Sequence, residues 1–270
     1  MSFRGASAGA FAALRDDLDS MLAGDPASAA QVGKELFGVS GVLRSEASLR
    51  RVVTDLSVAD EAKVGLVREV FGAKVSEAVV ALASAASGRR WTAPRDLADA
   101  LEQLGVLAIV KSAGDDAGRL SDELFEVGQL VKTNPELRDA LSDPARSQQD
   151  KGTLVRALLE GKALPATIDL VEQSLAGTHR TVGVALAAYQ QVAAEAYGQS
   201  VAEVRVARPL SDADRQRLEG ALSRQYGRAI HLNVVVDPDV IGGLRVEIGD
   251  DVIDGTVSSR LSDAGRKLAG

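Results

Sequence analysis

The stretch VDPDVIGGLRVEIGDDVIDGTVSSRL, from Val236 to Leu261, decides the fold of the C-terminal part of this chain. Its segments GLRVEI and VIDG predict two short strands around a turn, and Gly249 stands where that turn needs a positive φ. Further out, residues 201–207 and 230–236 alternate as half-buried strands do, and the segment between them predicts one helix. With a short basic helix expected in the last segment, residues 200–270 predict a small α+β module of strand–helix–hairpin–helix order.

The glycines and aspartates of this stretch also suggest a ligand site, which their spacing argues against. The two adjacent glycines do not form GxGxxG, and they precede a strand where a nucleotide loop would open a helix. Counted as an EF-hand loop from Asp250, two essential oxygen-ligand positions hold Val and Leu. Aspartates are common in turns, where their side chains accept from backbone donors. We interpret six residues as a structural turn motif: Gly242, Gly243, Gly249, Asp250, Asp254 and Gly255.

The chain before about residue 198 is expected to be helical, because apolar residues recur there every three or four positions. The predicted helices cover about 8–22, 27–43, 46–55, 58–71, 75–87, 95–111, 118–132, 135–141, 148–160, 166–176 and 180–197. Helix starts are indicated by Ser57 with Asp60, Asn134 with Pro135, and Ser147 with Asp150. Left-handed helix ends are indicated at Gly24, Gly72 and Gly161.

The helical part repeats itself at an offset of 88 residues. Glu35-Leu36-Phe37 matches Glu123-Leu124-Phe125, and the ungapped alignment of 35–68 holds 11 identities in 34 positions. Such self-similarity indicates a duplicated supersecondary unit, and two copies are too few for a solenoid. We therefore expect a mainly α chain of two tandem related bundles, 1–111 and 112–199, before the module at 200–270. The helix 95–111 bridges the two bundles or is shared between them.

Composition excludes several classes of protein. The net charge is −7, which disfavours a nucleic-acid partner, and the absence of cysteine rules out disulfides and zinc–thiolate sites. The longest uncharged run, about 181–194, is shorter than the roughly 18 apolar residues of a membrane span, so we expect a soluble chain. Residues 113–199 carry 8 basic and 13 acidic side chains, which indicates a basic partner there or a solvated face.

The search for catalytic chemistry finds no candidate set. His179 and His231 have no partner at metal-ligand spacing, and we expect both at the surface or at a cap. Trp91 follows two arginines, and we expect it to pack internally, with a protein contact as the alternative. No catalytic, cofactor-binding or metal-ligating residue is predicted. Helical bundles without a site indicate an interaction protein whose grooves receive partner helices.

The ordered motifs of the C-terminal part resemble a known family. Residues 236–261, with the preceding VRVARPLSDADRQRLEGALSRQYGRAIHLNVV, resemble the C-terminal signature of the delta subunit of F-type ATP synthases, the family of the oligomycin-sensitivity-conferring protein. The resemblance extends back through NPELRDALSDP and QQDKGTLVRALL to about residue 95. The family's usual SVRGxL is replaced by TVSSRL, and the additional N-terminal bundle is similar to an extended actinobacterial form.

The resemblance implies a non-catalytic stator subunit of the peripheral stalk, without a cofactor. The second bundle would be the family's N-terminal domain, which receives the N-terminal helices of the alpha subunits on the catalytic head. Residues 200–270 would bind the b subunit of the stalk. The chain would meet the membrane only through the complex, at the cytoplasmic face of the plasma membrane. It would hold the head still against the torque of the rotor.

Three questions stay open at the level of sequence. The first bundle would bind another alpha N-terminus, brace the stalk, or lengthen the connection. The alternative function is a free cytosolic adaptor or regulator that shares the fold. An enzyme would need polar groups that converge in one cleft, which the linear sequence does not reveal.

Overall fold

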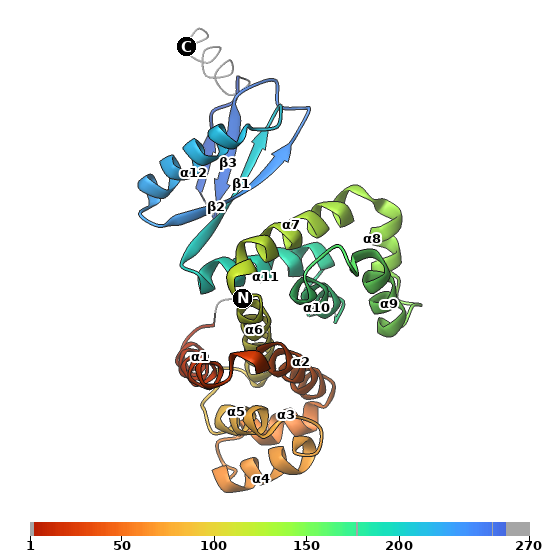
Figure 1. Cartoon of the computed structure of the whole chain (residues 1–270). Helices are drawn as coiled ribbons and strands as arrows, with labels where there is room; N and C mark the ends of the chain where they lie inside the picture. Colours follow the sequence, from red (N-terminus) through yellow and green to blue (C-terminus); the bar gives the residue numbers. More distant parts are fainter. Residues whose placement is uncertain (1–2, 177, 250, 258–270) are drawn as a thin grey trace, which may run out of the picture. The chain divides into compact units, whose positions relative to one another are not determined.

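A computed structural model describes residues 3–176, 178–249 and 251–257 of the chain (Figure 1). The chain divides into two compact units with the boundary between Val192 and Ala193. The N-terminal unit is helical, and the C-terminal unit holds a four-stranded sheet. The fold is therefore mainly α with a small α+β module, as the sequence predicts.

The first part of the helical unit runs through α1 (Ala6–Gly24), a short 3-10 turn η1 (Pro26–Ser28), α2 (Ala29–Ser45), α3 (Ala47–Thr54), α4 (Asp60–Phe71), α5 (Glu77–Ser87) and α6 (Pro94–Ser112). The second part continues through η2 (Gly114–Asp116), α7 (Ala117–Thr133), α8 (Pro135–Ser142), α9 (Gln148–Leu159), α10 (Pro165–Ser174) and α11 (Val182–Ala196). Each helix predicted from apolar spacing is present, with its ends shifted by a few residues at most.

The order of these helices repeats at the same offset as the sequence. Every element from α1 to α6, η1 included, has a counterpart that begins 88 residues later, in the order α6, η2, α7, α8, α9, α10 and α11. Helix α6 therefore occurs twice in the comparison, as the last helix of the first copy and as the first helix of the second. We call the sets α1–α6 and α6–α11 the first and second copy.

One repeated contact explains the matching Glu-Leu-Phe motifs. In the first copy the Glu35 carboxylate accepts hydrogen bonds from the backbone N–H of Ser76 at 2.9 Å and from its hydroxyl at 2.6 Å. In the second copy Glu123 accepts from the backbone N–H of Leu164 at 2.8 Å and from the Thr167 hydroxyl. Each glutamate thus satisfies a free donor at the start of the fifth helix of its copy. The glutamate that the two copies share therefore holds α5 against α2 in the first copy and α10 against α7 in the second.

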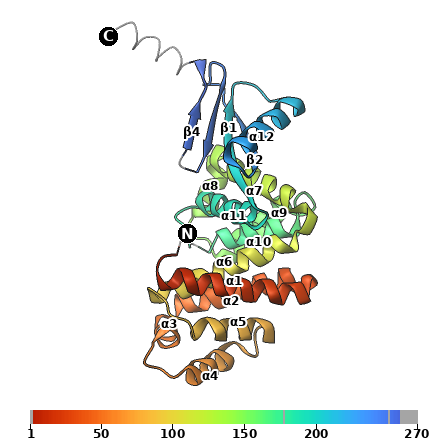
Figure 2. The ribbon, with the colours of Figure 1, turned by 90° about the vertical axis from the view of Figure 1, so that its left-hand side faces the viewer.

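Helix α6 is the core of the helical unit because both copies pack around it. Twelve of its residues are buried, including Leu97, Leu101, Leu104 and Ile109. Helix α2 crosses α6 closely, and α4 lies along α5 at the end of the first copy (Figures 1 and 2). From Ala100 to Val110 every residue of α6 except Gln103 is buried, so this segment has no solvent face and even Glu102 is buried.

The helix-end signals of the sequence are partly correct. Asn134 and Ser147 cap α8 and α9 by accepting backbone N–H groups, and Gly161 has a φ of 74°. Ser57 does not cap a helix, because its N–H and hydroxyl both donate to the Asp55 carboxylate and α4 begins only at Asp60. Two other predicted left-handed ends are wrong: Gly24 is still helical, and Gly72 has a φ of −57°.

The α+β module has the strand order β2-β1-β3-β4. Strand β1 (Gln199–Val206) pairs in parallel with β2 (Ala229–Val236), and α12 (Asp212–Tyr226) connects them. Strand β3 (Leu244–Ile248) pairs antiparallel with β1 and with β4 (Asp251–Asp254). Alternate side chains of β1 are buried and form one core with residues from α12 and the other strands. The predicted basic helix at the end of the chain falls on residues 258–270, outside the described residues.

Candidate functional site

Two places in the molecule carry specific constructions, the turn motif of the α+β module and a buried polar network around α6. Of the six residues of the turn motif, Asp250 lies outside the described residues. Gly243 has a φ of 82°, and a Cβ added there would lie 2.3 Å from the carbonyl oxygen of Gly255. The N–H of Gly255 donates to the carbonyl of Leu244 at 3.0 Å. This close backbone approach needs glycine at position 243.

Asp254 is the last residue of β4, and Gly242, Gly249 and Gly255 lie just outside the strands of the hairpin. The Asp254 carboxylate accepts from the hydroxyl of Thr256 at 2.7 Å and from its N–H at 3.0 Å, and these bonds lower the pKa of Asp254. Gly249 ends β3 with a φ of 58°. The N–H of Val257 donates to the carbonyl of Gly242 at 2.9 Å. Gly242, Gly243, Asp254 and Gly255 thus form a hydrogen-bonded backbone corner at one end of the β3–β4 hairpin, and Gly249 lies in the turn at its other end.

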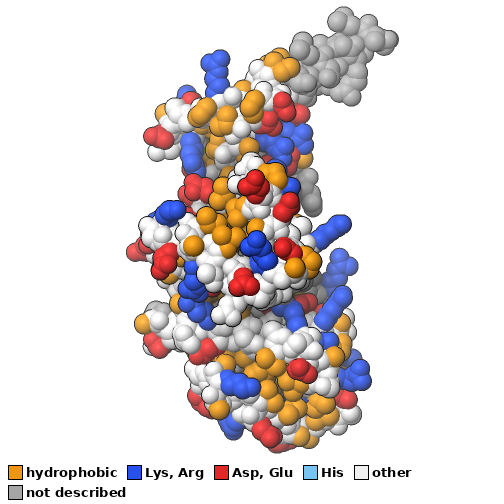
Figure 3. Space-filling view, turned by 90° about the vertical axis from the view of Figure 1, so that its right-hand side faces the viewer, with side chains coloured by type: hydrophobic (Ala, Val, Ile, Leu, Met, Phe, Trp, Pro, Cys, Tyr) orange, Lys and Arg blue, Asp and Glu red, His pale blue; other side chains and the backbone are white. Residues whose placement is uncertain are grey.

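Exposed apolar side chains stand at this corner. Ile241, next to the double glycine, is 76% exposed, Val236 at the end of β2 is 46% exposed, and Val257 is 40% exposed. On the face drawn in Figure 3, hydrophobic side chains reach the surface of this module. Exposed apolar side chains at one end of a sheet make this corner a candidate anchor for a partner.

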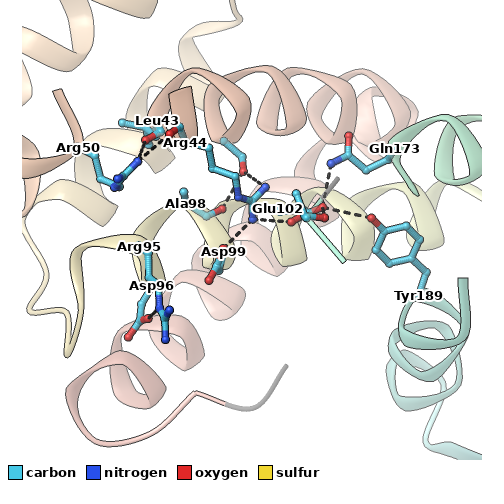
Figure 4. A network of polar contacts seen from close by, with 12 residues as sticks. Leu43, Arg44, Arg50, Arg95, Asp96, Ala98, Asp99, Glu102, Gln173 and Tyr189 are labelled. Atoms are coloured by element: carbon cyan, nitrogen blue, oxygen red, sulfur yellow. Dashed lines mark hydrogen bonds and ion pairs between the residues drawn. The ribbon is translucent and has the colours of Figure 1, made fainter. Parts of the chain in front are cut away.

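The second construction is a buried network centred on Glu102 of α6 (Figure 4). One carboxylate oxygen pairs with the Arg44 guanidinium of α2 at 2.6 Å. The other oxygen accepts from Gln173 at 2.9 Å, from Thr178 at 2.7 Å and from the Tyr189 hydroxyl at 3.2 Å. Glu102 thereby joins a helix of the first copy to α10, the following loop and α11 of the second copy.

The charge states in the network follow from these contacts. Burial would raise the pKa of Glu102, but the hydrogen bond from Gln173 and the charge of Arg44 outweigh it and lower the pKa below its ordinary 4.5. Burial, together with the neighbouring carboxylate, raises the pKa of Tyr189 far above its ordinary value, so its hydroxyl stays a donor. Arg44 also pairs with Asp99 at 2.7 Å. The network is therefore an ionised carboxylate held by one arginine and three neutral donors.

A second ion pair connects the two copies. Lys34 of α2 pairs at 2.9 Å with Asp169 of α10, whose side chain is only 8% exposed. Sequence reasoning missed this network, because Glu102 lies in a helix whose charged positions indicate an ordinary solvent face. The counterparts of Glu102 at the 88-residue offset are Leu14 and Gln190, both uncharged. The charge of Glu102, which both counterparts lack, could have indicated that this residue has a role specific to α6.

The other residues that the sequence singles out, Trp91 and the two histidines, are buried or half-buried. Trp91 is buried, and its indole N–H donates to the carbonyl of Ala86 at 2.9 Å, which confirms the packing interpretation. The half-buried ring of His179 meets Tyr189 edge-on, with ring centroids 5.7 Å apart, and burial lowers the pKa of His179. His231 lies half-buried on β2. Within the described ranges, no group of three or more His, Cys, Asp or Glu side chains is placed to hold a metal ion.

The described helices include none that is both long and apolar enough to span a bilayer. The described residues thus hold two constructions, the buried contacts that join the two copies of the helical unit and the exposed apolar side chains at the corner of the α+β module. Of the two, the exposed apolar side chains are the feature that suits contact with another protein.

Comparisons with known proteins agree with the motifs. A family model described as ATP synthase delta (OSCP) subunit matches residues 106–268 and so begins inside α6. The ATP synthase subunit delta of a Nocardioides species is 55% identical over 273 residues, covering 100% of this chain and 98% of the relative. Those of Kineococcus radiotolerans and Streptomyces coelicolor are 42% and 41% identical, and each alignment covers 98% of both chains. The family model covers more than half of the chain and these relatives also match its first copy, so the chain belongs to the ATP synthase delta (OSCP) subunit family.

Proposed function

We propose that this chain is the stator subunit that ties the catalytic head of a proton-translocating F-type ATP synthase to its peripheral stalk. The family's subunit is a structural part of the complex and not a catalyst. The helical unit would hold the head through N-terminal helices of the alpha subunits. The α+β module would hold the b subunit of the stalk. The chain would lie at the cytoplasmic face of the plasma membrane and associate with the membrane only through the complex.

The observation that carries this proposal is the joint at α6. A stator must keep its shape under torque in the part that would hold the head, which is the helical unit. Two bundles linked by a flexible connection would yield, whereas two copies that share one buried helix cannot rotate about a linker. The Glu102 network and the Lys34–Asp169 pair add polar contacts across the same joint. Buried charge networks contribute more to a defined geometry than to net stability, which is the property a brace needs.

The apolar corner of the α+β module supports the stalk contact. Ile241 stands exposed on a turn that is fixed by hydrogen bonds and by the Gly243–Gly255 contact. A preorganised apolar side chain loses little entropy on binding and can insert between the side chains of a helix. The helical end of the b subunit would supply such a surface.

The experiment that tests the function is depletion of the chain followed by measurement of proton-driven ATP synthesis in inverted membrane vesicles. We expect synthesis to fall to background and to return when purified protein is added. The chain should copurify with the synthase and leave the membranes in low salt or mild denaturant without detergent. Undiminished synthesis after depletion would favour the alternative of a free adaptor that shares the fold.

A further inference from the structure

The α3–α4 end of the first copy carries apolar side chains that are exposed to water. Val52 on α3 is 40% exposed, and Leu56 in the following turn is 64% exposed. Exposed Ala59 and Ala62 and half-buried Val58 follow them in the sequence. On the face drawn in Figure 3, hydrophobic side chains gather at this end of the first copy. We call these five residues the distal patch.

The second copy shows that the fold does not require apolar residues at these positions. The counterparts of the distal patch at the 88-residue offset are Ala140, Pro144, Arg146, Ser147 and Asp150. Helices α8 and α9 form around these residues as α3 and α4 form around the patch. Arg146 and Asp150 are exposed charged side chains, as expected at a helix end in water. Since the same supersecondary unit forms with polar residues there, the apolar residues of the first copy have a role beyond folding.

The start of α4 also lacks a stabilising contact that its counterpart has. Ser147 caps α9, because its hydroxyl accepts from the Asp150 N–H at 3.1 Å. The counterpart of Ser147 is Ala59, the N-cap of α4, which has no side-chain acceptor. Alanine is a less favourable N-cap than serine. An exposed alanine in place of a cap is expected where the surface itself serves a purpose.

The turn that carries Leu56 is fixed on both sides. The Asp55 carboxylate accepts from the N–H of Ser57 at 2.8 Å and from its hydroxyl at 2.7 Å. On the other side, the Lys63 ammonium pairs with Asp60 at 3.3 Å, and the lysine side chain is buried. Leu56 is therefore held in place before any partner arrives. A preorganised apolar side chain loses little entropy on binding and suits an interface anchor.

The charges around the distal patch indicate the kind of helix that would fit it. Residues 55–62 hold three acidic side chains and no basic one. Their counterparts, residues 143–150, hold two acidic side chains and Arg146, which pairs with Asp143 at 3.7 Å. Glu61 is exposed in the first turn of α4. An apolar surface with an acidic rim complements an amphipathic helix that has Lys or Arg beside its apolar stripe.

We propose that the distal patch binds a basic-edged segment of the helical b subunit, so that the stalk holds the chain at two places. This inference rests on the proposed function, and it selects the bracing of the stalk among the three roles that the sequence leaves open for the first copy. The α+β module would hold the helical end of b, and the helix that precedes this end would lie on α3 and α4. A contact there transfers load directly to the helical unit, which would hold the head.

The test compares two soluble fragments of the b subunit by calorimetric titration into the full chain. One fragment is the C-terminal segment, which would bind only the α+β module, and the other is the whole part of b outside the membrane. We expect the longer fragment to bind about ten-fold more tightly or better, because linked contacts add avidity. The double variant Val52→Ala, Leu56→Ser should remove this gain and leave the affinity for the C-terminal segment unchanged.

Two further variants make the result specific. Leu130→Ser changes a leucine of the second copy that is 44% exposed on α7, and it should leave both affinities unchanged. Glu61→Gln introduces the residue that the second copy has at this position, Gln149. It should reduce the salt dependence of binding of the longer fragment, because one charge of the acidic rim is removed.

Equal affinity of the two fragments for the unaltered chain, or an unchanged gain in the double variant, overturns the inference while the proposed function stands. A loss in the double variant that is confined to binding of an N-terminal peptide of the alpha subunit assigns the patch to the head, and it overturns the inference as well. Failure of the C-terminal segment to bind the unaltered chain contradicts the proposed function itself.

Discussion

Gly33 of α2 and Gly105 of α6 face each other at the point where the two helices cross. A Cβ added to either glycine would lie 2.9 to 3.0 Å from the carbonyl oxygen of the other. The Phe37 ring and the Ile109 side chain close over the two glycines, within 2.7 Å of where those Cβ atoms would stand. The joint of the helical unit thus depends on two residues that have no side chain.

The Gly33→Ala variant should lose about 1–3 kcal/mol of stability, because the added methyl forces the two helices apart. Gly38 lies on the same helix with nothing within 4 Å of an added Cβ, so Gly38→Ala should gain up to about 1 kcal/mol from helix propensity. Urea denaturation of the full chain, followed by helical circular dichroism, measures both. Equal effects of the two substitutions would contradict the close packing.

The Glu102→Gln variant should destabilise the helical unit by about 1–3 kcal/mol at neutral pH, as expected for charge-assisted hydrogen bonds. The folded-state pKa of Glu102 lies below the ordinary 4.5, so its contribution is complete above 4.5 and is lost as the pH falls through the lower folded-state value. The stability difference between the two proteins should therefore shrink as the pH falls below 4.5. Denaturant titrations at several pH values check this, and a difference that grows in acid would refute it.

The Gly243→Val variant should loosen the α+β module, because its side chain would meet the Gly255 carbonyl and its backbone would need a φ of 82°. The expected cost is about 3 kcal/mol or more, since steric contact adds to backbone strain. Gly249→Ala has only the φ of 58° to overcome, with no atom within 4 Å, and should cost about 1–2 kcal/mol. Hydrogen exchange of the strand amides measures both losses of stability. A loss in Gly249→Ala as large as that in Gly243→Val would contradict the close backbone contact at Gly243.

The Ile241→Ser variant should weaken binding to a soluble C-terminal segment of the b subunit by about ten-fold. Its own stability should change by less than about 0.5 kcal/mol, because a side chain that is 76% exposed contributes little to folding. Leu56→Ser is the control, since Leu56 is 64% exposed but lies in the helical unit. Equal binding by the two variants would place the stalk contact elsewhere.

The sequence predicts this fold well where local signals agree with packing. Apolar spacing locates the helices, and the alternation in residues 201–207 and 230–236 locates the two parallel strands. Ser57 shows where local reasoning fails, because the Asp55 carboxylate takes the N–H and hydroxyl that the capping pattern assigned to a helix start.

The candidate sites are less predictable from sequence, because they depend on contacts between the copies. Glu102 reads as a surface residue of an amphipathic helix, and only the wrapping of α6 by both copies buries it. Likewise, Ala81 of α5 is exposed while its counterpart Asp169 of α10, 88 residues later, is buried, because among the described residues no helix lies on Ala81 as α2 lies on Asp169. The sequence does predict the turn at Gly249, since its backbone geometry is local.

Because α6 belongs to both copies, it determines where such a chain can be truncated and how a further copy could be added. A fragment that begins at Pro94 keeps six helices for the second copy, whereas one that begins at residue 112 loses the helix around which that copy is built. A third copy would need only 88 more residues and five new helices. Each added copy would again share a buried helix with its neighbour, so a longer chain of this kind would gain length without gaining a linker.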